Sequence, residues 1–346
     1  MRKLASIQKI EEVLPIEGAD NLVKVRIKGW WCVARKDEFK PEDFCCYIEV
    51  DSLVPNTPAF SFLAKGNSLK KSVIEDGKEV EGFRIKTIKL RGQISQGLAL
   101  PLSSFPSLVV DNPFTPDLDV SEQIGIHKFE PPIPVHLTGE VKGQFPGFIP
   151  KTDEERVQNS SDLLEKYRGQ RFYLTEKIDG TSSTFFKYGT ISPPYGFGVC
   201  GHNIEFKEND KTVFWRLAKK YSLAEKIPDG FAIQAETAGE GIQSNRLKIK
   251  GIDLFVFYVI DIKKCQYLKL EDMKLFVKDL GLKTVPIIDD NFVLNHTCDE
   301  LLKLADEPSI LSPELPKEGI VFRLYDSLEK ISFKAVSNAY LLKYGT

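Results

Sequence analysis

The stretch FYLTEKIDGTSSTFF, from Phe172 to Phe186, interrupts a run of strand-forming residues with a lysine, an aspartate and a glycine. Apolar and β-branched residues on both sides of Lys177 predict two strands, because such residues suit a pleated, half-buried surface. One interpretation is a β-hairpin whose charged tip lies in solvent. The other is a lysine held in a pocket with Asp179 on the same strand face, since side-chain direction repeats every two residues. Gly180 would then allow a tight turn close to a ligand.

The length and composition of the chain limit the classes of protein to consider. Its 346 residues exceed one average domain and leave room for two. Hydrophobic residues make up 42% and charged residues 28%, which is ordinary for a globular protein with a sizeable core. The net charge of −2 argues against coating of nucleic acid through bulk charge, although a local basic groove is compatible with it. No run of about 18 apolar residues predicts a membrane span, and the N-terminus lacks the apolar segment of a secretory signal.

The cysteines and histidines are scattered rather than grouped. No pair of cysteines has the C-x-x-C spacing of zinc and redox sites, so we interpret all six as reduced thiols of an intracellular protein. The four histidines show no metal-ligand spacing either. We therefore expect a protein of the cytoplasm or nucleus that is not secreted. The residues concerned are Cys32, Cys45, Cys46, Cys200, Cys265, Cys298, His127, His136, His202 and His296.

Short strands separated by turn residues fill the first 105 residues. The runs are ASIQKIEEVLPI, LVKVRIKGWWCVA, FCCYIEVDSLV, FRIKTIKL and QGLALPL. Five such runs in about 100 residues predict a small Greek-key barrel, the OB-fold. Trp30, Trp31 and Arg35 could bind single-stranded nucleic acid on one face of this barrel. The alternative is that the tryptophans belong to the barrel core.

The composition changes after residue 105. Residues 106–170 are rich in Pro and Gly and predict an extended connector, which ends in a leading helix at SSDLLEKYRG. Ser160 or Ser161 would be the N-cap of that helix and Gly169 its stop. From residue 171 to residue 346, strand-like and helix-like segments mix without strict alternation. This pattern predicts an α+β domain of antiparallel sheets with flanking helices.

A lysine at the end of an apolar strand has a specific chemical use. At neutral pH a free lysine is protonated and cannot attack an electrophile. Burial and a neighbouring cation lower the pKa of the ammonium group, and the flexible side chain can then deliver an amine. We therefore take Lys177 as a candidate nucleophile with a lowered pKa. The K-x-D-G pattern alone is common by chance, so this assignment depends on the rest of the domain.

The downstream sequence supplies that context. EKIDG, which contains Lys177, resembles motif I of the covalent nucleotidyltransferase superfamily, which includes ATP-dependent ligases and mRNA capping enzymes. FAIQAETAGEGIQSNRLKIKG with Glu236 looks like motif III, and DLFVFYVIDI looks like motif IIIa. KEGIVFRL with Glu318 looks like motif IV, and KISFKAVSNAYLLKY with Lys334 looks like motif V. All five occur in the family's order within residues 171–346, a combination more specific than any one motif.

The resemblance implies a catalytic role for five matching residues. Lys177 would attack the α-phosphate of a nucleotide, and Lys334 would offset the negative charge that develops there. Asp179, Glu236 and Glu318 would hold Mg²⁺ or Mn²⁺, directly or through water.

Other residues would bind the nucleotide. By resemblance, Glu176 would recognise the adenine amino group, and Phe257, in preference to Phe255, would stack on the base. Gly180 would let the backbone approach a phosphate. RNA ligases with a leading barrel domain carry a related segment at this distance before motif I, where this chain has FPGFIPKTDEERVQN. A second stretch of the same kind, in the first domain, is IKLRGQISQGLALPL. The candidates for phosphate or adenylate contacts in the segment before motif I are Lys151, Thr152, Arg156 and Asn159.

Two positions depart from the family pattern. RNA ligases carry Arg-Asn where this chain has His202–Asn203, so Asn203 fits and the arginine is missing. Motif V commonly reads K-x-K, and here Ser332 occupies the first position before Lys334. Lys330 could replace the missing lysine only from another position. These departures concern individual phosphate contacts rather than the overall reaction.

An OB domain before the transferase, with none expected after it, is similar to a small family of ATP-dependent RNA ligases that join 3′-OH and 5′-phosphate ends. The domains would be residues 1–105 and 171–346, with the connector and leading helix at 106–170. The resemblance implies lysyl-AMP and adenylylated-RNA intermediates, ATP with Mg²⁺ or Mn²⁺, and a role in RNA repair. The partner would be RNA, with DNA as a further candidate on the 5′ side, and we expect a monomer. The barrel would contact the flank that bears the 3′-hydroxyl.

Two other functions compete with this interpretation. One is a GTP-dependent capping-type nucleotidyltransferase, which uses the same motifs. The other is a non-catalytic protein that binds single-stranded nucleic acid. The intact set of Lys177, Asp179, Glu236, Glu318 and Lys334 argues against the second alternative.

Overall fold

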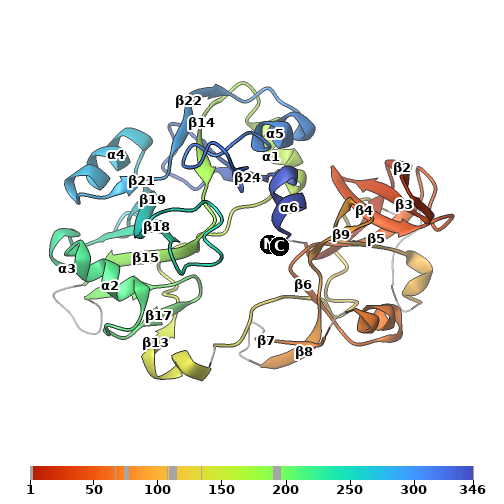
Figure 1. Cartoon of the computed structure of the whole chain (residues 1–346), viewed down its shortest axis with the longest axis horizontal. Coiled ribbons are helices and arrows are strands. Elements are labelled where there is room, and N and C mark those ends of the chain that lie inside the picture. The colour runs from red at the N-terminus through yellow and green to blue at the C-terminus, as the bar shows by residue number, and fades with distance from the viewer. Residues whose placement is uncertain are drawn as a thin grey trace. The chain divides into compact units, whose positions relative to one another are not determined.

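A computed structural model describes residues 3–66, 68–73, 78–106, 108, 115–133, 135–189 and 196–345 of the chain (Figure 1). The chain divides into two compact units, Met1–Pro134 together with Leu341–Thr346, and Val135–Tyr340. Within the expected connector, residues 107, 109–114 and 134 lie outside the described residues.

The N-terminal unit consists mainly of short antiparallel strands, as its turn-rich sequence predicted. One sheet has the order β2-β3-β4, a second β1-β5-β11 and a third β12-β6-β8-β7, while β9 and β10 form a two-stranded ribbon. The elements are β1 (Ala5–Lys9), β2 (Glu12–Ile16), β3 (Ala19–Ile27), β4 (Trp30–Arg35), β5 (Phe44–Ile48), β6 (Ser52–Val54), the 3-10 helix η1 (Pro58–Lys65), β7 (Lys70–Val73), β8 (Glu79–Arg84), β9 (Thr87–Leu90), β10 (Gln93–Gln96), β11 (Leu98–Pro101), the 3-10 helix η2 (Leu102–Ser104) and β12 (His127–Lys128).

The two tryptophans of the β3–β4 hairpin have different environments. Trp30 is fully buried and packs in an apolar cluster with Val25 and Tyr47, so it is a core residue. Trp31 is partly exposed, and Nζ of Lys24 lies 4.8 Å from the centre of its ring. The interpretation as core therefore holds for Trp30 and not for Trp31.

The second unit is α+β and contains two large sheets, as predicted. One sheet has the order β13-β17-β16-β15-β18-β19-β20, with β21 paired to β19, and the other has the order β22-β14-β23-β24. The elements are the 3-10 helix η3 (Val135–Glu140), β13 (Val141–Gln144), the 3-10 helix η4 (Val157–Asn159), α1 (Ser161–Lys166), β14 (Arg171–Lys177), β15 (Thr181–Lys187), β16 (Phe197–Cys200), β17 (Ile204–Phe206), α2 (Val213–Lys220), α3 (Leu223–Lys226), β18 (Phe231–Gly239), β19 (Ile252–Asp261), β20 (Gln266–Tyr267), α4 (Leu270–Asp279), β21 (Lys283–Thr284), β22 (Ile287–Val293), α5 (Cys298–Ala305), β23 (Gly319–Leu324), β24 (Ser332–Val336) and α6 (Asn338–Tyr344).

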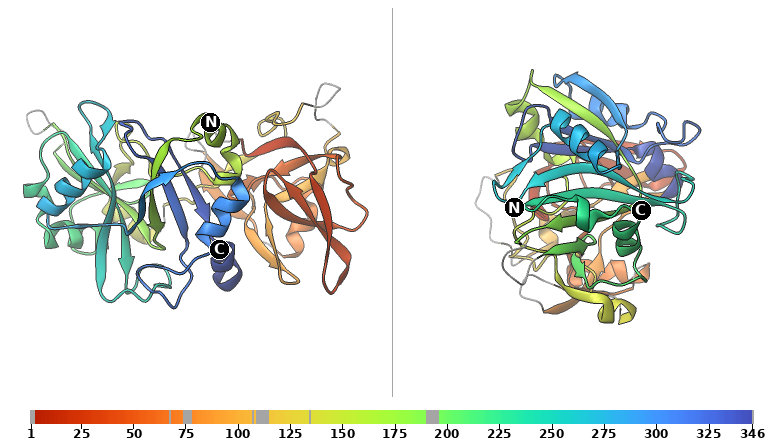
Figure 2. Two further views of the ribbon diagram at one scale, coloured as in Figure 1. Left: turned by 90° about the horizontal axis from the view of Figure 1, so that it is seen from above. Right: turned by 90° about the vertical axis from the view of Figure 1, so that its left-hand side faces the viewer.

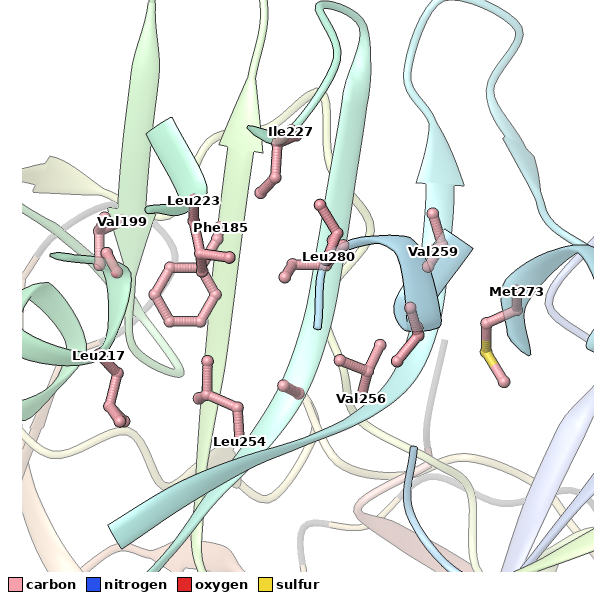
Figure 3. Close-up of a cluster of buried hydrophobic side chains, with 14 of the residues drawn as sticks. Phe185, Val199, Leu217, Leu223, Ile227, Leu254, Val256, Val259, Met273 and Leu280 are labelled. Carbon is pink, nitrogen blue, oxygen red and sulfur yellow. The ribbon is translucent and has the colours of Figure 1, made fainter. Parts of the chain in front are cut away.

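Helices cover one face of the larger sheet. Leu217 of α2 and Met273 of α4 belong to the same buried apolar cluster as Phe185 of β15 and Leu254 of β19 (Figure 3). The opposite face of the same sheet carries a separate apolar cluster, which includes Phe257. Because side chains alternate along each strand, the helices occupy one face and leave the other to the segments around Lys177. The views of Figure 2 show these layers from two further directions.

β14 and β15 do not form a hairpin. β14 pairs with β22 and β23 in the smaller sheet, whereas β15 pairs with β16 and β18 in the larger one. The three residues between them, 178–180, therefore carry the chain from one sheet to the other. The interpretation of EKIDG as a hairpin tip is wrong, and Lys177 lies instead at the junction of two sheets.

The predicted helices form with one interruption. The segment TVFWRLAKKYSLAEKI divides into α2 and α3 because Ser222 adopts a left-handed backbone conformation with φ of 52°. None of the helices described is long and apolar enough to cross a membrane.

Candidate active site

Lys177 lies at the end of β14, where the chain leaves the smaller sheet. In the ladder between β14 and β23 it stands opposite Gly319, the first residue of β23. Glu318 immediately precedes that glycine, and its Oε1 accepts a hydrogen bond of 2.5 Å from Nζ of Lys177. The side chains of Lys177 and Glu318 are 26% and 19% exposed, so both can be reached by a ligand. The predicted nucleophile and the predicted motif IV carboxylate are in direct contact.

Two glycines allow the strands to approach closely around this pair. A Cβ atom at Gly180 would lie 2.5 Å from the carbonyl oxygen of Thr237 and 2.9 Å from Cγ of Glu236. A Cβ atom at Gly319 would overlap the carbonyl oxygen of Ala335. A side chain at either position would push the backbones apart. The absence of a side chain at Gly180 therefore lets the linker between β14 and β15 lie against β18, which carries Glu236.

The charges around Lys177 favour its protonated form. Burial alone lowers the pKa of Lys177, but the carboxyl groups of Glu318, Glu236 and Asp179 outweigh burial and raise that pKa above its ordinary value. The expectation of a lowered lysine pKa is therefore wrong for the ligand-free protein. The acids reach the ammonium group from separate segments of the chain, and no local spacing reveals their combined effect.

Glu236 is itself perturbed by this environment. Burial raises the pKa of Glu236 to about 8, and Glu318 and Asp179 act in the same direction, while Lys177 opposes them. A carboxyl group with such a pKa is mainly protonated at neutral pH.

Lys334 has a lowered pKa, in contrast to Lys177. Burial and the positive charges of Lys177 and Arg156 lower the pKa of Lys334 to about 8. The backbone explains the proximity of Arg156, because N–H of Lys334 donates to the carbonyl oxygen of Glu155 over 2.7 Å and Arg156 forms a parallel bridge with Lys334. Nδ2 of Asn159 donates to Oε1 of Glu155 over 3.2 Å. The structure thus brings the upstream candidates Arg156 and Asn159 beside motif V.

Asp179 has two neighbours that the sequence did not indicate. Nη1 of Arg246 lies 3.7 Å from Oδ2 of Asp179 and donates a hydrogen bond of 2.9 Å to the hydroxyl group of Tyr340. Arg246 lies in the stretch that resembles motif III. Its positive charge is the one feature of the sequence that could have indicated a place in the site. Tyr340 lies in α6, and nothing in its local pattern pointed to the site.

The segment before motif I contributes another predicted contact. Nζ of Lys151 donates to Oδ1 of Asn203 over 3.2 Å, so two predicted nucleotide-binding residues lie together. His202, at the position of the missing arginine, has Nε2 3.7 Å from Oδ1 of Asp153. The turn between β16 and β17, which carries His202 and Asn203, therefore contributes polar side chains to this cluster but no arginine.

Glu154, which no sequence pattern indicated, anchors this segment to motif V. Its Oε2 accepts a hydrogen bond of 2.5 Å from Oγ of Ser332, and its Oε1 accepts one of 2.9 Å from the hydroxyl group of Tyr258. Nζ of Lys330 lies 3.8 Å from Oε2 of Glu154 and donates to the carbonyl oxygen of Lys151 over 3.2 Å. Ser332 and Lys330 thus hold the upstream segment in place where the family pattern has a lysine.

The two predicted adenine contacts are buried. Both carboxylate oxygens of Glu176 already accept hydrogen bonds, one of 2.5 Å from Oγ of Ser309 and one of 2.7 Å from N–H of Ile310. Phe257 is 9% exposed and Phe255 is 6% exposed, and both belong to the apolar cluster opposite the helices. Glu176 therefore holds the loop before β23, and any contact with a base would add to these hydrogen bonds.

Asp179, Glu236 and Glu318 offer oxygen atoms suited to a hard divalent cation. In the part of the chain that the structure describes, no three His, Cys, Asp or Glu side chains are arranged as a complete metal site. However, Oδ2 of Asp179 and Oε2 of Glu318 are buried and accept no hydrogen bond from the described residues. Mg²⁺ commonly takes one or two carboxylates and completes its octahedron with water and substrate phosphates. The residues present fit such an open site.

The comparisons with known proteins identify both parts of the chain. A family model of an OB-fold domain matches residues 4–102, and a family model described as RNA ligase matches residues 170–336. None of the curated proteins matches the chain significantly.

Solved structures extend the match over the whole chain. Naegleria gruberi RNA ligase with AMP and Mn, in a lysine-to-methionine variant, is 40% identical over 99% of this chain and 99% of its own, with a TM-score of 0.82. The same ligase with PPi is 40% identical over 99% of each chain, with a TM-score of 0.81. A lysine-to-alanine variant with ATP and Mn is 39% identical over 99% of each chain, with a TM-score of 0.82.

These matches agree with the features of the described residues. They confirm the predicted OB-fold before the α+β unit, and the resemblance to ligases rather than capping enzymes. An identity of 40% across essentially the full length of both chains is far beyond a likeness of fold alone. This chain belongs to the RNA ligase family.

Proposed function

We propose that the chain is an ATP-dependent RNA ligase that joins 3′-OH and 5′-phosphate ends. In the first step Nζ of Lys177 attacks the α-phosphorus of ATP, a P–N bond forms, the P–O bond to the bridging oxygen breaks, and pyrophosphate leaves. In the second, AMP passes from Lys177 to the 5′-phosphate of an RNA end. In the third, the 3′-hydroxyl attacks that phosphate and AMP leaves. The supporting observation is the contact of Lys177 with Glu318, near Asp179, Glu236 and Lys334.

Lys177 has to lose a proton before it can attack. Oε1 of Glu318, 2.5 Å from Nζ, is the nearest acceptor for that proton. A divalent cation bound with the triphosphate would neutralise the carboxyl groups of Asp179, Glu236 and Glu318 and stabilise charge on the α-phosphate. With that negative field reduced, burial and Lys334 would lower the pKa of Lys177.

The cations of the site would hold the phosphates. Lys334 and Arg156 lie together and repel each other in the ligand-free protein, as the lowered pKa of Lys334 indicates. A triphosphate bound between Lys334 and Arg156 would relieve this repulsion. Because the two cations are already placed side by side, the relief would contribute to the binding energy of the triphosphate. Lys151, Asn203 and Asn159 would contact the phosphates or the adenylate, and Gly180 would keep the backbone close to them.

For the base, we assign Glu176 and Phe257. A carboxylate offers about four lone-pair positions, so Glu176 can accept a further hydrogen bond from an adenine amino group. Phe257 would stack on the ring.

The family supports our choice of ligands, and the setting is a further proposal. One of the Naegleria gruberi ligase structures contains AMP with Mn and another contains ATP with Mn, and we assign ATP and Mg²⁺ or Mn²⁺ to this chain. We further propose a monomer that accepts RNA, with DNA as a candidate on the 5′ side, and an intracellular setting in keeping with its free thiols. Residues 1–105 and 171–346 would be the two domains, joined by 106–170, and the barrel would contact the RNA flank that bears the 3′-hydroxyl.

Mass spectrometry of the purified full chain after incubation with ATP and Mg²⁺ or Mn²⁺ tests the proposal. We expect one added AMP on the peptide that contains Lys177, and none in Lys177→Ala. The variant should still seal RNA that is already adenylylated at its 5′ end, because the third step does not need the nucleophile. Adenylation of another lysine, or a preference for GTP over ATP, would contradict the assignment.

A further inference from the structure

The ribbon of β9 and β10 is a hairpin of the N-terminal unit to which the proposed reaction assigns no role. Its strands pair from Thr87 opposite Gln96 to Leu90 opposite Gln93, and a two-residue turn at Arg91 and Gly92 joins them. Within the described residues, β9 pairs with no strand other than β10, so it is an outer edge. Most of the hairpin lies within IKLRGQISQGLALPL, the stretch noted in the sequence, and its first strand is labelled β9 in Figure 1.

This hairpin is basic in a protein whose net charge is negative. Lys86, Lys89 and Arg91 are exposed, and no acidic residue occurs between Ile85 and Leu98. None of these three cations forms an ion pair within the described part of the chain, whereas many others in the same unit do. The paired examples are Lys9 with Glu42, Lys28 with Asp117, Lys71 with Glu79, Arg84 with Asp51 and Lys128 with Glu130.

The turn places a long, positively charged side chain at a position whose backbone conformation disfavours any side chain other than Asn or Asp. Arg91 has φ of 49° and Gly92 has φ of 82°, so both central residues are left-handed. Such turns normally take Asn, Asp or Gly at the first central position, because a longer side chain is strained there. Arg91 therefore carries a conformational cost at the exposed tip, where it also presents a positive charge.

The base of the hairpin is firmly held. The carbonyl oxygen of Gln96 accepts hydrogen bonds from the hydroxyl group of Tyr47 over 3.0 Å and from Sγ of Cys32 over 3.3 Å. Oγ of Ser95 accepts one of 2.9 Å from N–H of Val33. These bonds tie β10 to the barrel, so the outer strand is displayed on a fixed support. A preformed support lowers the entropy lost when a ligand binds.

We propose that the β9–β10 hairpin is an arm that binds the sugar-phosphate backbone of the RNA substrate. Lys86, Lys89 and Arg91 contact phosphates, because unpaired exposed cations recover Coulomb energy and release counterions when they meet a polyanion. Ile88 and Leu90, which are 48% and 37% exposed, pack on ribose. This inference rests on the proposed function for its choice of RNA as the partner.

The test compares two triple variants of the full chain. Lys86→Ala, Lys89→Ala and Arg91→Ala removes the cations of the arm. Lys36→Ala, Lys40→Ala and Lys65→Ala removes three exposed lysines elsewhere in the same unit and causes the same change in net charge. Fluorescence anisotropy with a labelled single-stranded oligoribonucleotide gives the dissociation constant across a salt series, and a thermal melt of each variant verifies folding.

We expect the arm variant to bind RNA roughly tenfold more weakly and its log–log salt slope to decrease by about 2, at about 0.7 per phosphate contact on a single strand. The control variant should keep the slope of the unmodified protein. Adenylation by ATP should be equal in all three proteins, because the arm takes no part in the first step. Sealing should fall at low RNA concentration and recover at saturating RNA.

The opposite outcomes would overturn the inference. Equal slopes for the arm and control variants would mean that the cations only protect an edge strand from pairing with other chains. Weaker RNA binding in Ile88→Ser with Leu90→Ser, but not in the arm variant, would indicate an apolar docking site. Failure of the unmodified chain to become adenylated would contradict the proposed function. The anisotropy series would still decide whether the hairpin binds RNA, because that measurement does not depend on adenylation.

Discussion

Nζ of Lys177 and Oε1 of Glu318 lie 2.5 Å apart, although 141 residues separate them in the chain. The ladder between β14 and β23 sets this distance, because Lys177 stands opposite Gly319 and Glu318 precedes that glycine. The contact raises the pKa of Lys177 and favours its protonated form. In the proposed reaction, this ion pair would have to weaken before Lys177 could attack the nucleotide.

Glu318→Gln should make Lys177 more reactive as a free amine. The substitution removes a charge that raises the pKa of Lys177, so this pKa should fall and the unprotonated fraction should rise at any pH below it. Each unit of the decrease corresponds to about a tenfold larger amine fraction. Acetylation of Lys177 by a dilute amine-selective reagent, followed by peptide mass spectrometry in metal-free buffer, measures the change.

The matched control for this variant is Glu307→Gln, because Glu307 pairs with Lys317 instead. Its effect on Lys177 acetylation should be small. Equal acetylation of Lys177 in the unmodified protein and Glu318→Gln would show that Glu318 does not hold the proton.

Gly180→Ala should damage both stability and adenylation. The added Cβ atom would lie 2.5 Å from the carbonyl oxygen of Thr237, and a backbone atom cannot yield as a flexible side chain can. We expect a loss of about 1–3 kcal/mol in the free energy of unfolding, the usual range for overpacking. Urea denaturation measures that loss, and adenylation should decline because the linker that follows Lys177 would be pushed away from β18 and Glu236.

Gly147→Ala is the matched control, because a Cβ atom there would meet nothing within 4 Å. It should change the free energy of unfolding by less than about 0.5 kcal/mol. If Gly180→Ala behaved in the same way, the close approach of the two backbones would not matter for folding.

Lys330→Ala should weaken adenylation through the position of the upstream segment. Lys330 donates to the carbonyl oxygen of Lys151 and lies near Glu154, so its loss would loosen the support of Lys151 and Arg156. We expect the apparent KM for ATP to rise by about tenfold, with a smaller effect on kcat, since misplaced binding groups weaken productive binding. Initial rates of adenylation over an ATP series separate the two parameters.

Ser332→Lys added to Lys330→Ala should restore part of the loss, because it returns a lysine to the first position of K-x-K beside Glu154. Lys264→Ala, at a lysine with a 71% exposed side chain, serves as the control and should leave KM unchanged. An unchanged KM in Lys330→Ala would mean that Lys330 does not support the ATP site.

The stability contribution of Lys334 should depend on pH in a defined direction. Its pKa is lowered from 10.5 to about 8, so the folded protein binds fewer protons than the unfolded chain between these values. Stability should therefore rise with pH across this window, and Lys334 should be least favourable below pH 8. The difference in free energy of unfolding between the unmodified protein and Lys334→Met should shift in favour of the unmodified protein as pH rises from 7 to 10.

Urea denaturation of both proteins at several pH values measures that difference. Lys278→Met, which changes a lysine whose helix position lies outside the site, provides the comparison. A difference between the unmodified protein and Lys334→Met that is constant with pH would show that Lys334 is not repelled by its neighbours.

The sequence was most informative where a pattern is local. EKIDG, the strand around Glu236 and the strand after Glu318 each combine a short run of strand formers with a glycine or acid at a fixed spacing. Their positions in β14, β18 and β23 follow from that spacing. The segment that resembles motif III also contains Arg246. Several charged residues occur in this segment, and the sequence alone does not show that Arg246 is the one that contacts Asp179.

Interactions between distant segments were harder to predict. Glu154 is an unremarkable acid in KTDEER, and its role appears only when Ser332 and Tyr258 meet it from two other strands. Tyr340 likewise reaches Arg246 across 94 residues. The lowered pKa was assigned to the wrong lysine, because the sum of charges around Lys177 and Lys334 depends on side chains brought together by folding.

The amino-acid sequence by itself determined the order of a barrel before a transferase domain, the strand that carries Lys177, and the set of acids and lysines available for chemistry. These depend on short-range spacing and on residue type, which the chain carries before it folds. Only the tertiary structure decided that Lys177 lies between two sheets rather than on a hairpin, that Glu318 is its partner, and that Lys334 has the lowered pKa. Coulomb energies and burial vary with distance and surroundings in three dimensions, so the protonation of each group became defined only when the strands had assembled.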